Sequence, residues 1–172
     1  MGNTLLAMPC FTEAAIGTKV VTVFPNNIKR NLPVIDGVMI ISNSSTGKPE
    51  ALIDGATLTA VRTGAVGGVG AELLCSKTEP KLGVIGCGIQ GHHQAISICE
   101  GLHVRDISLF DVSQDRVASA LTHINKHCPK ATVKSADTVA DLVEHSDIVV
   151  TATSATKPVV PDDEDLVRGK TF

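Results

Sequence analysis

Gly86-Cys87-Gly88-Ile89-Gln90-Gly91 follows the apolar run 81–85, and Asp111 lies 20 residues past the last glycine, at the end of the next apolar run. Glycine-rich turns are common in proteins, so the motif alone is weak. Here, however, the turn lies between a strand-like and a helix-like segment, and an acidic residue follows at the expected distance. This arrangement is typical of a dinucleotide-binding βαβ unit.

The three glycines have different roles in such a unit. Gly86 permits the tight turn, Gly88 lets the main chain approach a pyrophosphate, and Gly91 lets the helix pack closely on the strand. Main-chain amides at the start of the helix would then point at the phosphates, aided by the helix dipole. The alternative is an ordinary strand–turn–helix corner, which the downstream acid disfavours. We assign cofactor binding to Gly86, Gly88, Ile89, Gln90 and Gly91.

Asp111 is expected to accept hydrogen bonds from the adenosine ribose hydroxyls. Its charge would repel a 2′-phosphate, so the sequence favours NAD(H) over NADP(H). The alternative is an Asp that caps the turn before Ser113, and spacing favours the ribose role. Arg116 is near enough in sequence to reach a phosphate and alter this preference.

A run of small and hydroxyl residues follows the apolar segment 148–150. Ligands of doubly wound sheets lie beyond the carboxyl ends of the strands, so this run is expected to border the cofactor. A polar loop without that role is nearly as well supported by spacing. The residues are Thr151, Ala152, Thr153 and Ser154.

The alternation of strand-like and helix-like segments after residue 78 predicts a parallel, Rossmann-type sheet with right-handed crossovers. Ser113 and Asp137 are candidate N-caps of its second and third helices. Gly169–Phe172 resembles the beginning of another strand, so we expect the sheet to be incomplete and the chain to be part of a longer protein. The predicted strands are 81–86, 106–111, 131–135 and 147–152, and the helices are 89–100, 114–127 and 137–145.

The segment before residue 78 has a different pattern, and we predict part of an α+β domain over 1–77 and the dinucleotide-binding domain over 78–172. A β-branched strand at 18–24 is followed by a hairpin over 34–42 and 49–53. Asp54 is positioned to cap a helix over 55–74. Glycines inside that helix are costly, so they predict close packing against another element or else a kink: Gly64, Gly67, Gly68 and Gly70.

Composition excludes several classes of function. The chain is 43% hydrophobic and 19% charged, with a net charge of −3, which argues against nucleic acid as a partner. No apolar run reaches membrane-spanning length. Five cysteines without CxxC spacing indicate reduced thiols in a cytoplasmic protein. His123 and His127 are four residues apart, but no further ligand cluster accompanies them, so we assign no metal.

Several blocks of sequence, in their order and spacing, resemble the ornithine cyclodeaminase/mu-crystallin family over nearly the whole chain. The resemblance implies a Rossmann domain that binds NAD(H), joined to an α+β domain that contacts substrate and forms a homodimer. It also implies that Lys19 and Arg62 bind the substrate carboxylate. The matching blocks are Met8-Pro9, 17–27, 54–64, 84–91 and 146–153.

The resemblance further implies hydride transfer at the α-carbon of a small α-amino or α-imino acid. Two cations would hold the carboxylate rigidly, which places the α-carbon beside the nicotinamide. Ornithine cyclodeaminase, alanine dehydrogenase and imine reductase activities all fit this description. The alternative is a crystallin-like NAD(P)H-binding protein without turnover.

The sequence departs from the family pattern in three places. The family's first carboxylate-binding Arg would precede Met1, and its catalytic Asp would follow Phe172. No catalytic residue is therefore assigned, and the 172-residue chain is expected to lack turnover. Leu6 stands where cyclodeaminases have a Glu two positions before Met-Pro. This departure shifts the prediction toward dehydrogenase or imine reductase chemistry.

Overall fold

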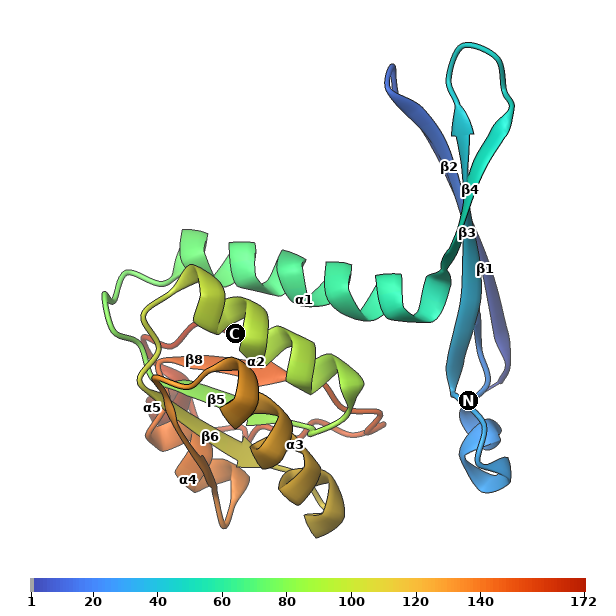
Figure 1. Cartoon of the computed structure of the whole chain (residues 1–172). Coiled ribbons are helices and arrows are strands. Elements are labelled where there is room, and N and C mark those ends of the chain that lie inside the picture. The colour runs from blue at the N-terminus through green and yellow to red at the C-terminus, as the bar shows by residue number, and fades with distance from the viewer. Residues whose placement is uncertain (1) are drawn as a thin grey trace. The chain divides into compact units, whose positions relative to one another are not determined.

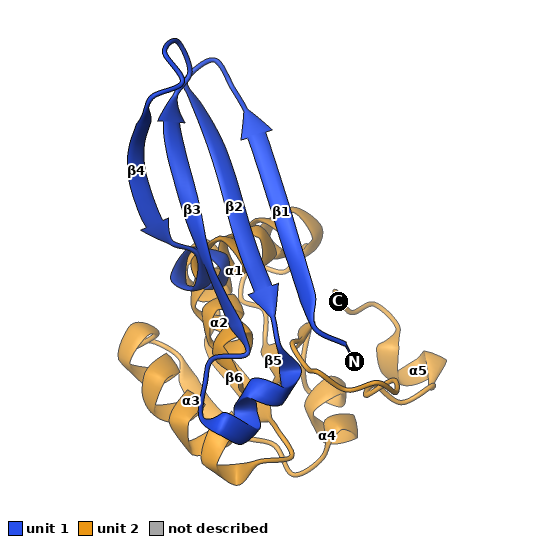
Figure 2. Ribbon diagram, turned by 90° about the vertical axis from the view of Figure 1, so that its right-hand side faces the viewer, with its two compact units in different colours: residues 1–60 blue, residues 61–172 orange. Residues whose placement is uncertain are grey.

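The computed structural model describes residues 2–172, which form two compact units. One extends to Ala60 and the other covers Val61–Phe172 (Figure 2). The division falls inside the long helix α1 (Gly55–Leu74). The domain boundary near residue 78 stays a prediction. None of the helices within residues 2–172 combines the length and the apolar character needed to cross a membrane.

The first unit is an antiparallel sheet in the order β1-β2-β3-β4. The predicted strand at 18–24 and the hairpin are confirmed, and a 3-10 helix (Pro25–Arg30) follows β2. The edge strand β1 was not predicted, because Pro9 within it argues against a regular strand. Pro9 is tolerated there because one side of an edge strand has no partner. The strands are β1 (Thr4–Phe11), β2 (Ala15–Val23), β3 (Ile35–Asn43) and β4 (Pro49–Asp54).

The second unit contains the parallel sheet that the sequence predicts, and its strands lie in the order β7-β6-β5-β8. Thr171 makes one further parallel bridge, to Ile148 of β8, at the place where the sequence predicts another strand. The strands are β5 (Leu82–Ile85), β6 (Asp106–Phe110), β7 (Thr132–Ser135) and β8 (Ile148–Thr151). The helices are α2 (Ile89–Gly101), α3 (Gln114–His127), α4 (Val139–Glu144) and α5 (Glu164–Val167).

Both faces of the parallel sheet are covered, as Figure 1 shows. Alternate residues of β5 point in opposite directions: Val84 packs with α2 and α3, whereas Ile85 packs with α4 and α5. The larger core cluster is on the α2 and α3 side and includes Ile98 and Ile124, which are 1% and 0% exposed. Burial on both faces explains why these strands are continuous apolar runs.

Helix α1 packs through its glycines and not through its large apolar side chains. A Cβ atom at Gly64 would lie 2.6 Å from the carbonyl oxygen of His93 on α2, and one at Gly68 would lie 2.9 Å from that of Ser97. The helix is continuous over all 20 residues, so close packing and not a kink compensates for the glycines. Larger side chains such as Leu73 are exposed on the other face.

The helix caps correct one prediction. Asp54 caps α1 as expected, with its Oδ1 accepting a hydrogen bond from the Thr57 amide at 2.6 Å. The prediction for Asp137 is wrong, because the Thr138 hydroxyl caps α4 and accepts a bond from the Asp141 amide at 3.1 Å. The chain is already extended at Thr138, which puts that hydroxyl one position closer to the free amides. Ser113 is at the N-cap position of α3 but makes no side-chain cap bond.

Two glycines of α1 provide a matched test of this packing. Gly64→Ala is expected to destabilise the second unit by about 1–3 kcal/mol, because the added methyl group meets main-chain atoms that cannot move aside cheaply. Gly70→Ala is the control: a Cβ there meets nothing within 4 Å. This control is expected to be neutral or to stabilise by up to about 1 kcal/mol through helix propensity. Urea unfolding measures both, and equal effects would contradict the packing argument.

Candidate functional site

The glycine loop connects β5 to α2 and requires glycine at two positions. Gly86 has a φ of +100°, and a Cβ on it would lie 2.4 Å from the carbonyl oxygen of Ala152. A Cβ on Gly91 would lie 2.0 Å from the carbonyl oxygen of Gly86. Gly88 differs, because a Cβ there would meet nothing within 4 Å. The main chain at Gly88 therefore borders open space, which a ligand group can occupy.

The first turn of α2 offers polar groups to a ligand. Gly88 is the N-cap residue, and no side chain caps the helix. The first amides of a helix lack partners within it and attract anions. In addition, the side-chain oxygen Oε1 of Gln90 is buried without a hydrogen-bond partner among the described residues. The open space at Gly88 and the uncapped start of α2 fit the dinucleotide predicted from the sequence.

Asp111 is buried (8% exposed) immediately after β6, and its carboxylate joins two segments of the chain. Its Oδ2 accepts a hydrogen bond from the Cys87 amide at 2.8 Å, and its Oδ1 accepts one from the Ser113 amide at 2.9 Å. The turn-capping bond considered from the sequence is therefore present. A carboxylate has about four acceptor positions, so it retains capacity for ribose hydroxyls. The ribose role stays a prediction.

The run after β8 lies next to the glycine loop. The Ala152 amide donates to the carbonyl oxygen of Ile85 at 2.8 Å, and the Gly86 amide donates to that of Phe110 at 2.8 Å. The carboxyl ends of β5, β6 and β8 thus meet at one edge of the sheet. The structure brings the glycine loop, Asp111 and Ala152 together there, and Thr151, Thr153 and Ser154 are in the same run.

Cys87 is the one residue of this loop to which sequence analysis gave no role, yet its amide anchors Asp111. Its side chain is 2% exposed and belongs to the core. Burial, together with the negative charge of Asp111, raises the pKa of the Cys87 thiol to about 11. The thiol is therefore neutral and unreactive at physiological pH. Only its place between two glycines of the motif indicated a main-chain role.

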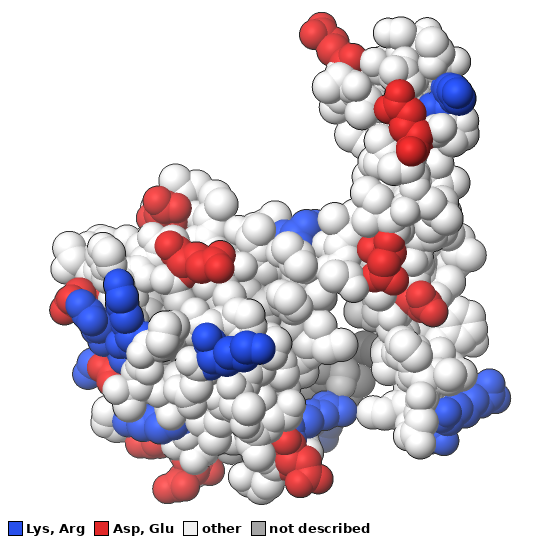
Figure 3. Space-filling view, viewed as in Figure 1, with Lys and Arg blue, Asp and Glu red and all other residues white. Residues whose placement is uncertain are grey.

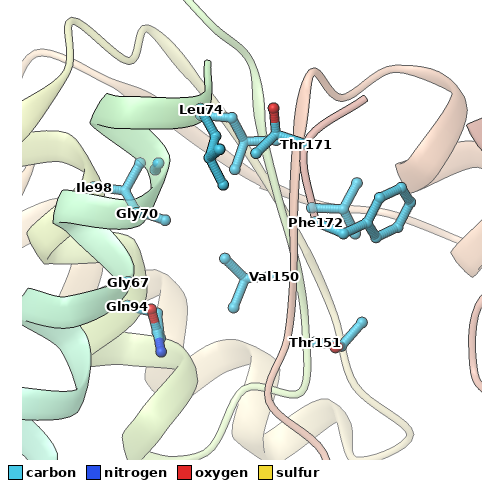
Figure 4. Close-up of a pocket in the computed structure, with 12 residues that line it drawn as sticks. Gly67, Gly70, Leu74, Gln94, Ile98, Val150, Thr151, Thr171 and Phe172 are labelled. Carbon is cyan, nitrogen blue, oxygen red and sulfur yellow. The ribbon is translucent and has the colours of Figure 1, made fainter. Parts of the chain in front are cut away.

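A hollow of about 280 Å³ in the second unit lies between α1, α2 and β8 (Figure 4). Gly67 and Gly70 line it from α1, and Thr171 and Phe172 line it from the opposite side. Thr151 is the member of the predicted cofactor set that contributes to its wall. The hollow is therefore distinct from the loop edge formed by Gly86 and Asp111.

Lys19, the predicted substrate ligand on β2, is 7% exposed. Its Nζ donates a hydrogen bond to the hydroxyl of Thr59 at 3.2 Å, a partner that sequence analysis did not identify. Arg62 follows on the same helix, is exposed and belongs to the second unit. The role of the two cations in substrate binding stays a prediction. On the face seen in Figure 3, basic and acidic side chains are interspersed.

Four histidines gather where α2 and α3 pack. The ring centroids of His92 and His123 are 5.3 Å apart, and those of His123 and His127 are 4.8 Å apart. Burial, followed by the neighbouring His123, lowers the pKa of both His92 and His93. Within residues 2–172, no group of three or more His, Cys, Asp or Glu side chains is placed to hold a metal ion.

Comparison with known proteins identifies similar sequences and structures. The model of the ornithine cyclodeaminase/mu-crystallin family matches residues 2–168. Delta(1)-pyrroline-2-carboxylate reductase of Bacillus cereus is 33% identical over 159 residues, which are 91% of this chain and 49% of that protein. Alanine dehydrogenase of Archaeoglobus fulgidus is 31% identical, over 91% of this chain and 47% of that protein. The chain thus spans about half the length of these relatives.

Solved structures of related enzymes match this chain over about the same share of its length as the sequence relatives do. The reductase of Thermococcus litoralis, in complex with NADH and L-proline, matches with a TM-score of 0.87 and 31% identity, over 92% of this chain and 49% of that chain. A lysine cyclodeaminase matches with a TM-score of 0.81 and 28% identity, over 95% of this chain and 51% of that chain. At this coverage, both structural matches include residues of the antiparallel sheet and of the parallel sheet.

The histidine cluster predicts a loss of stability in mild acid. The pKa values of His92 and His93 in the folded chain lie below the reference value of 6.5, so the unfolded chain binds protons first. The free energy of unfolding is expected to fall as the pH drops from about 7.5 to 5.5. His123→Gln should reduce this loss, and the exposed His103→Gln should not. Denaturant titrations between these pH values measure the free energy of unfolding of the unmodified chain and of each variant. If this free energy falls with pH equally steeply in His123→Gln and in the unmodified chain, the coupling to His123 is contradicted.

Proposed function

Because the chain belongs to the ornithine cyclodeaminase/mu-crystallin family, we propose that it is part of an NAD(H)-dependent enzyme that transfers hydride at the α-carbon of a small α-amino or α-imino acid. The observation that carries the proposal is the bond between the glycine loop and Asp111, with 2.8 Å between the Cys87 amide and Oδ2. This bond holds the glycine loop against Asp111, the acid that we propose binds the ribose. The reductase of Thermococcus litoralis, solved with NADH, supports the cofactor.

The cofactor half of the site is the edge formed by the glycine loop. The amides of Ile89 and Gln90 at the start of α2 would hold the pyrophosphate, and Asp111 would hold the adenosine ribose. Thr151, the last residue of β8, and the following residues 152–154 would border the nicotinamide half. When bound, the nicotinamide supplies the hydride donor or acceptor.

The substrate half depends on Lys19 and Arg62. Lys19 is buried and its ammonium is oriented by the Thr59 hydroxyl, so its direction is fixed before a ligand binds. Arg62, exposed on α1, would supply the second positive charge. Charge-assisted hydrogen bonds from two cations would hold a carboxylate and orient its α-carbon.

Within this class, an imine reductase or an amino-acid dehydrogenase fits better than a cyclodeaminase, which is a lyase. Leu6 replaces the carboxylate expected in cyclodeaminases. The named relatives at 33% and 31% identity are a pyrroline-carboxylate reductase and an alanine dehydrogenase. We further propose a cytoplasmic homodimer.

Oxidation of NADH with pyrroline-2-carboxylate, or reduction of NAD with alanine, by the full-length protein tests the activity. NADH binding without any turnover would favour the crystallin-like alternative.

Asp111 is expected to make NADH bind more tightly than NADPH. Asp111→Ser and Asp111→Asn also weaken the bond to the Cys87 amide, so both cofactors should lose affinity. The ratio of the two affinities isolates the ribose contact, because loop damage affects both cofactors alike. We expect this ratio to fall toward one in both variants, as measured by fluorescence titration. Arg116→Ala is the control that shows whether Arg116 contacts a cofactor phosphate and so alters the preference for NADH. Tighter binding of NADPH to the unmodified protein would contradict the ribose assignment.

Arg62→Ala in the full-length protein is expected to cost about 2–5 kcal/mol of substrate or transition-state binding, with NADH affinity nearly unchanged. Lys19→Met should act similarly, since it keeps much of the side-chain bulk and removes the charge. Arg105→Ala is the matched control, because Arg105 is exposed and pairs with Glu79 at 3.5 Å. Steady-state kinetics, with the amino- or imino-acid substrate and the cofactor varied in turn, separate a loss of substrate binding from a loss of NADH affinity. Unaltered kcat/KM in Arg62→Ala would make it an ordinary surface cation.

A further inference from the structure

Lys19 lies on a face of the antiparallel sheet where its neighbours in the strands are apolar. Its partners in the register are Met8 of β1 and Met39 of β3, and residues opposite each other in antiparallel strands point to the same face. Val21, two residues further along β2, is on that face too and is 4% exposed. These neighbours can cover the aliphatic stem of Lys19, but they offer no side-chain oxygen to its ammonium.

An oxygen acceptor for the ammonium comes from a different element. The Nζ atom of Lys19 donates a hydrogen bond to the hydroxyl of Thr59 on α1 at 3.2 Å, although the two residues are 40 positions apart in the chain. Both residues belong to the first unit. An ammonium turns readily about its last carbon–nitrogen bond, and a bond to a fixed acceptor limits that rotation. The direction of the Lys19 hydrogens therefore depends on where Thr59 is held.

The start of α1 holds Thr59 in place through two contacts. A Cβ on Gly55, the first residue of α1, would lie 2.6 Å from the carbonyl carbon of Gly37 on β3, so the helix begins against the main chain of that strand. The side chain of Asp54, the last residue of β4, caps the helix through the Thr57 amide at 2.6 Å. The turn that carries Thr59 is thus attached to the same sheet from which the lysine emerges.

We propose that Thr59 is a positioning residue for substrate binding, because its hydroxyl aims the Lys19 ammonium at the substrate carboxylate before the substrate arrives. The inference rests on the proposed function, since it requires Lys19 to be a carboxylate ligand. A cation that is already oriented loses less rotational freedom when the ligand binds. Thr59 does not have to touch the substrate, so its contribution passes through Lys19.

A threonine that only stabilised α1 would behave differently in a double-mutant cycle. Loss of a purely structural bond changes the kinetics by the same factor whether or not the lysine is present. A bond that acts through Lys19 matters only while the ammonium is there. The coupling between substitutions at Thr59 and Lys19 therefore separates the two roles.

Steady-state kinetics of the full-length protein, with pyrroline-2-carboxylate or alanine as the varied substrate, test the role. Thr59→Val removes the hydroxyl with little change in shape, and we expect it to lower kcat/KM about 10- to 100-fold, as for a lost hydrogen bond to a charged group. KM for the cofactor should not change. Thr59→Ser keeps a hydroxyl and should recover most of the activity. In a Lys19→Met background, Thr59→Val should change kcat/KM by less than about twofold.

Thr122→Val is the matched control. Thr122 is exposed on α3, and its hydroxyl donates a hydrogen bond to the carbonyl oxygen of Ala118 at 3.1 Å. The same substitution there removes a hydroxyl and its bond at a place outside the proposed substrate site. This variant is expected to have the kinetics of the unmodified protein.

NMR of the 15N-labelled full-length protein follows the ammonium directly and needs no turnover. Burial and hydrogen bonding slow the exchange of protons with water. The Lys19 ammonium signal, identified by its loss in Lys19→Met, is therefore expected to exchange faster in Thr59→Val. Thr59→Ser should restore the slow exchange, and Thr122→Val should leave it unchanged.

Two results would overturn the role of Thr59. One is an equal fall in kcat/KM when Thr59→Val is made with and without Lys19, which would make the bond merely structural. The other is unchanged exchange of the ammonium protons in Thr59→Val. Absence of turnover by the unmodified protein would instead overturn the proposed function, and with it any role of Thr59 in substrate binding. Turnover with unchanged ammonium exchange would overturn the role of Thr59 alone, so the two failures are distinguishable.

Discussion

The carboxylate of Asp111 joins the ends of two strands, and the candidate site depends on that connection. The register of the parallel sheet pairs Ile85 with Phe110, so the residues that follow each strand emerge side by side. Asp111 then reaches the Cys87 amide at 2.8 Å. A buried carboxylate is costly unless it is hydrogen-bonded, and main-chain amides satisfy it without movement. The sheet register thus determines the shape of the glycine loop.

The position of α2 is fixed from the opposite side by α1. Glycine has a low helix propensity, so these residues destabilise α1 as an isolated helix. Gly64 and Gly68 nevertheless let α1 and α2 approach until their main chains are nearly in contact. Because α2 starts at the glycine loop, any change in its packing would move the main-chain amides of its first turn. The exposed Leu73 on the far face of α1 shows that the small residues, and not the large ones, make this contact.

Local patterns were sufficient to predict the parallel sheet, because its buried strands are continuous apolar runs and its helices have regular spacing. They failed where a residue's role depends on tertiary partners. Pro9 obscured β1, since only the sheet order shows that this strand is an edge. Asp137 and Thr138 are both good caps, and the backbone angle at Thr138 decides between them. The burial of Lys19 and its bond to Thr59 are likewise visible only in the structure.

The helix starts of the second unit show how the site is kept available. Thr138 caps α4 and the Asp163 side chain caps α5, whereas Ser113 at the start of α3 has a hydroxyl but makes no side-chain cap bond. At α2 the N-cap is Gly88, which costs only a few tenths of a kcal/mol relative to a side-chain cap. A serine or aspartate there would satisfy the amides internally and occupy the open space beside them. Glycine leaves both the donors and the space to an anionic ligand, and Asp111 holds the loop in shape without blocking it.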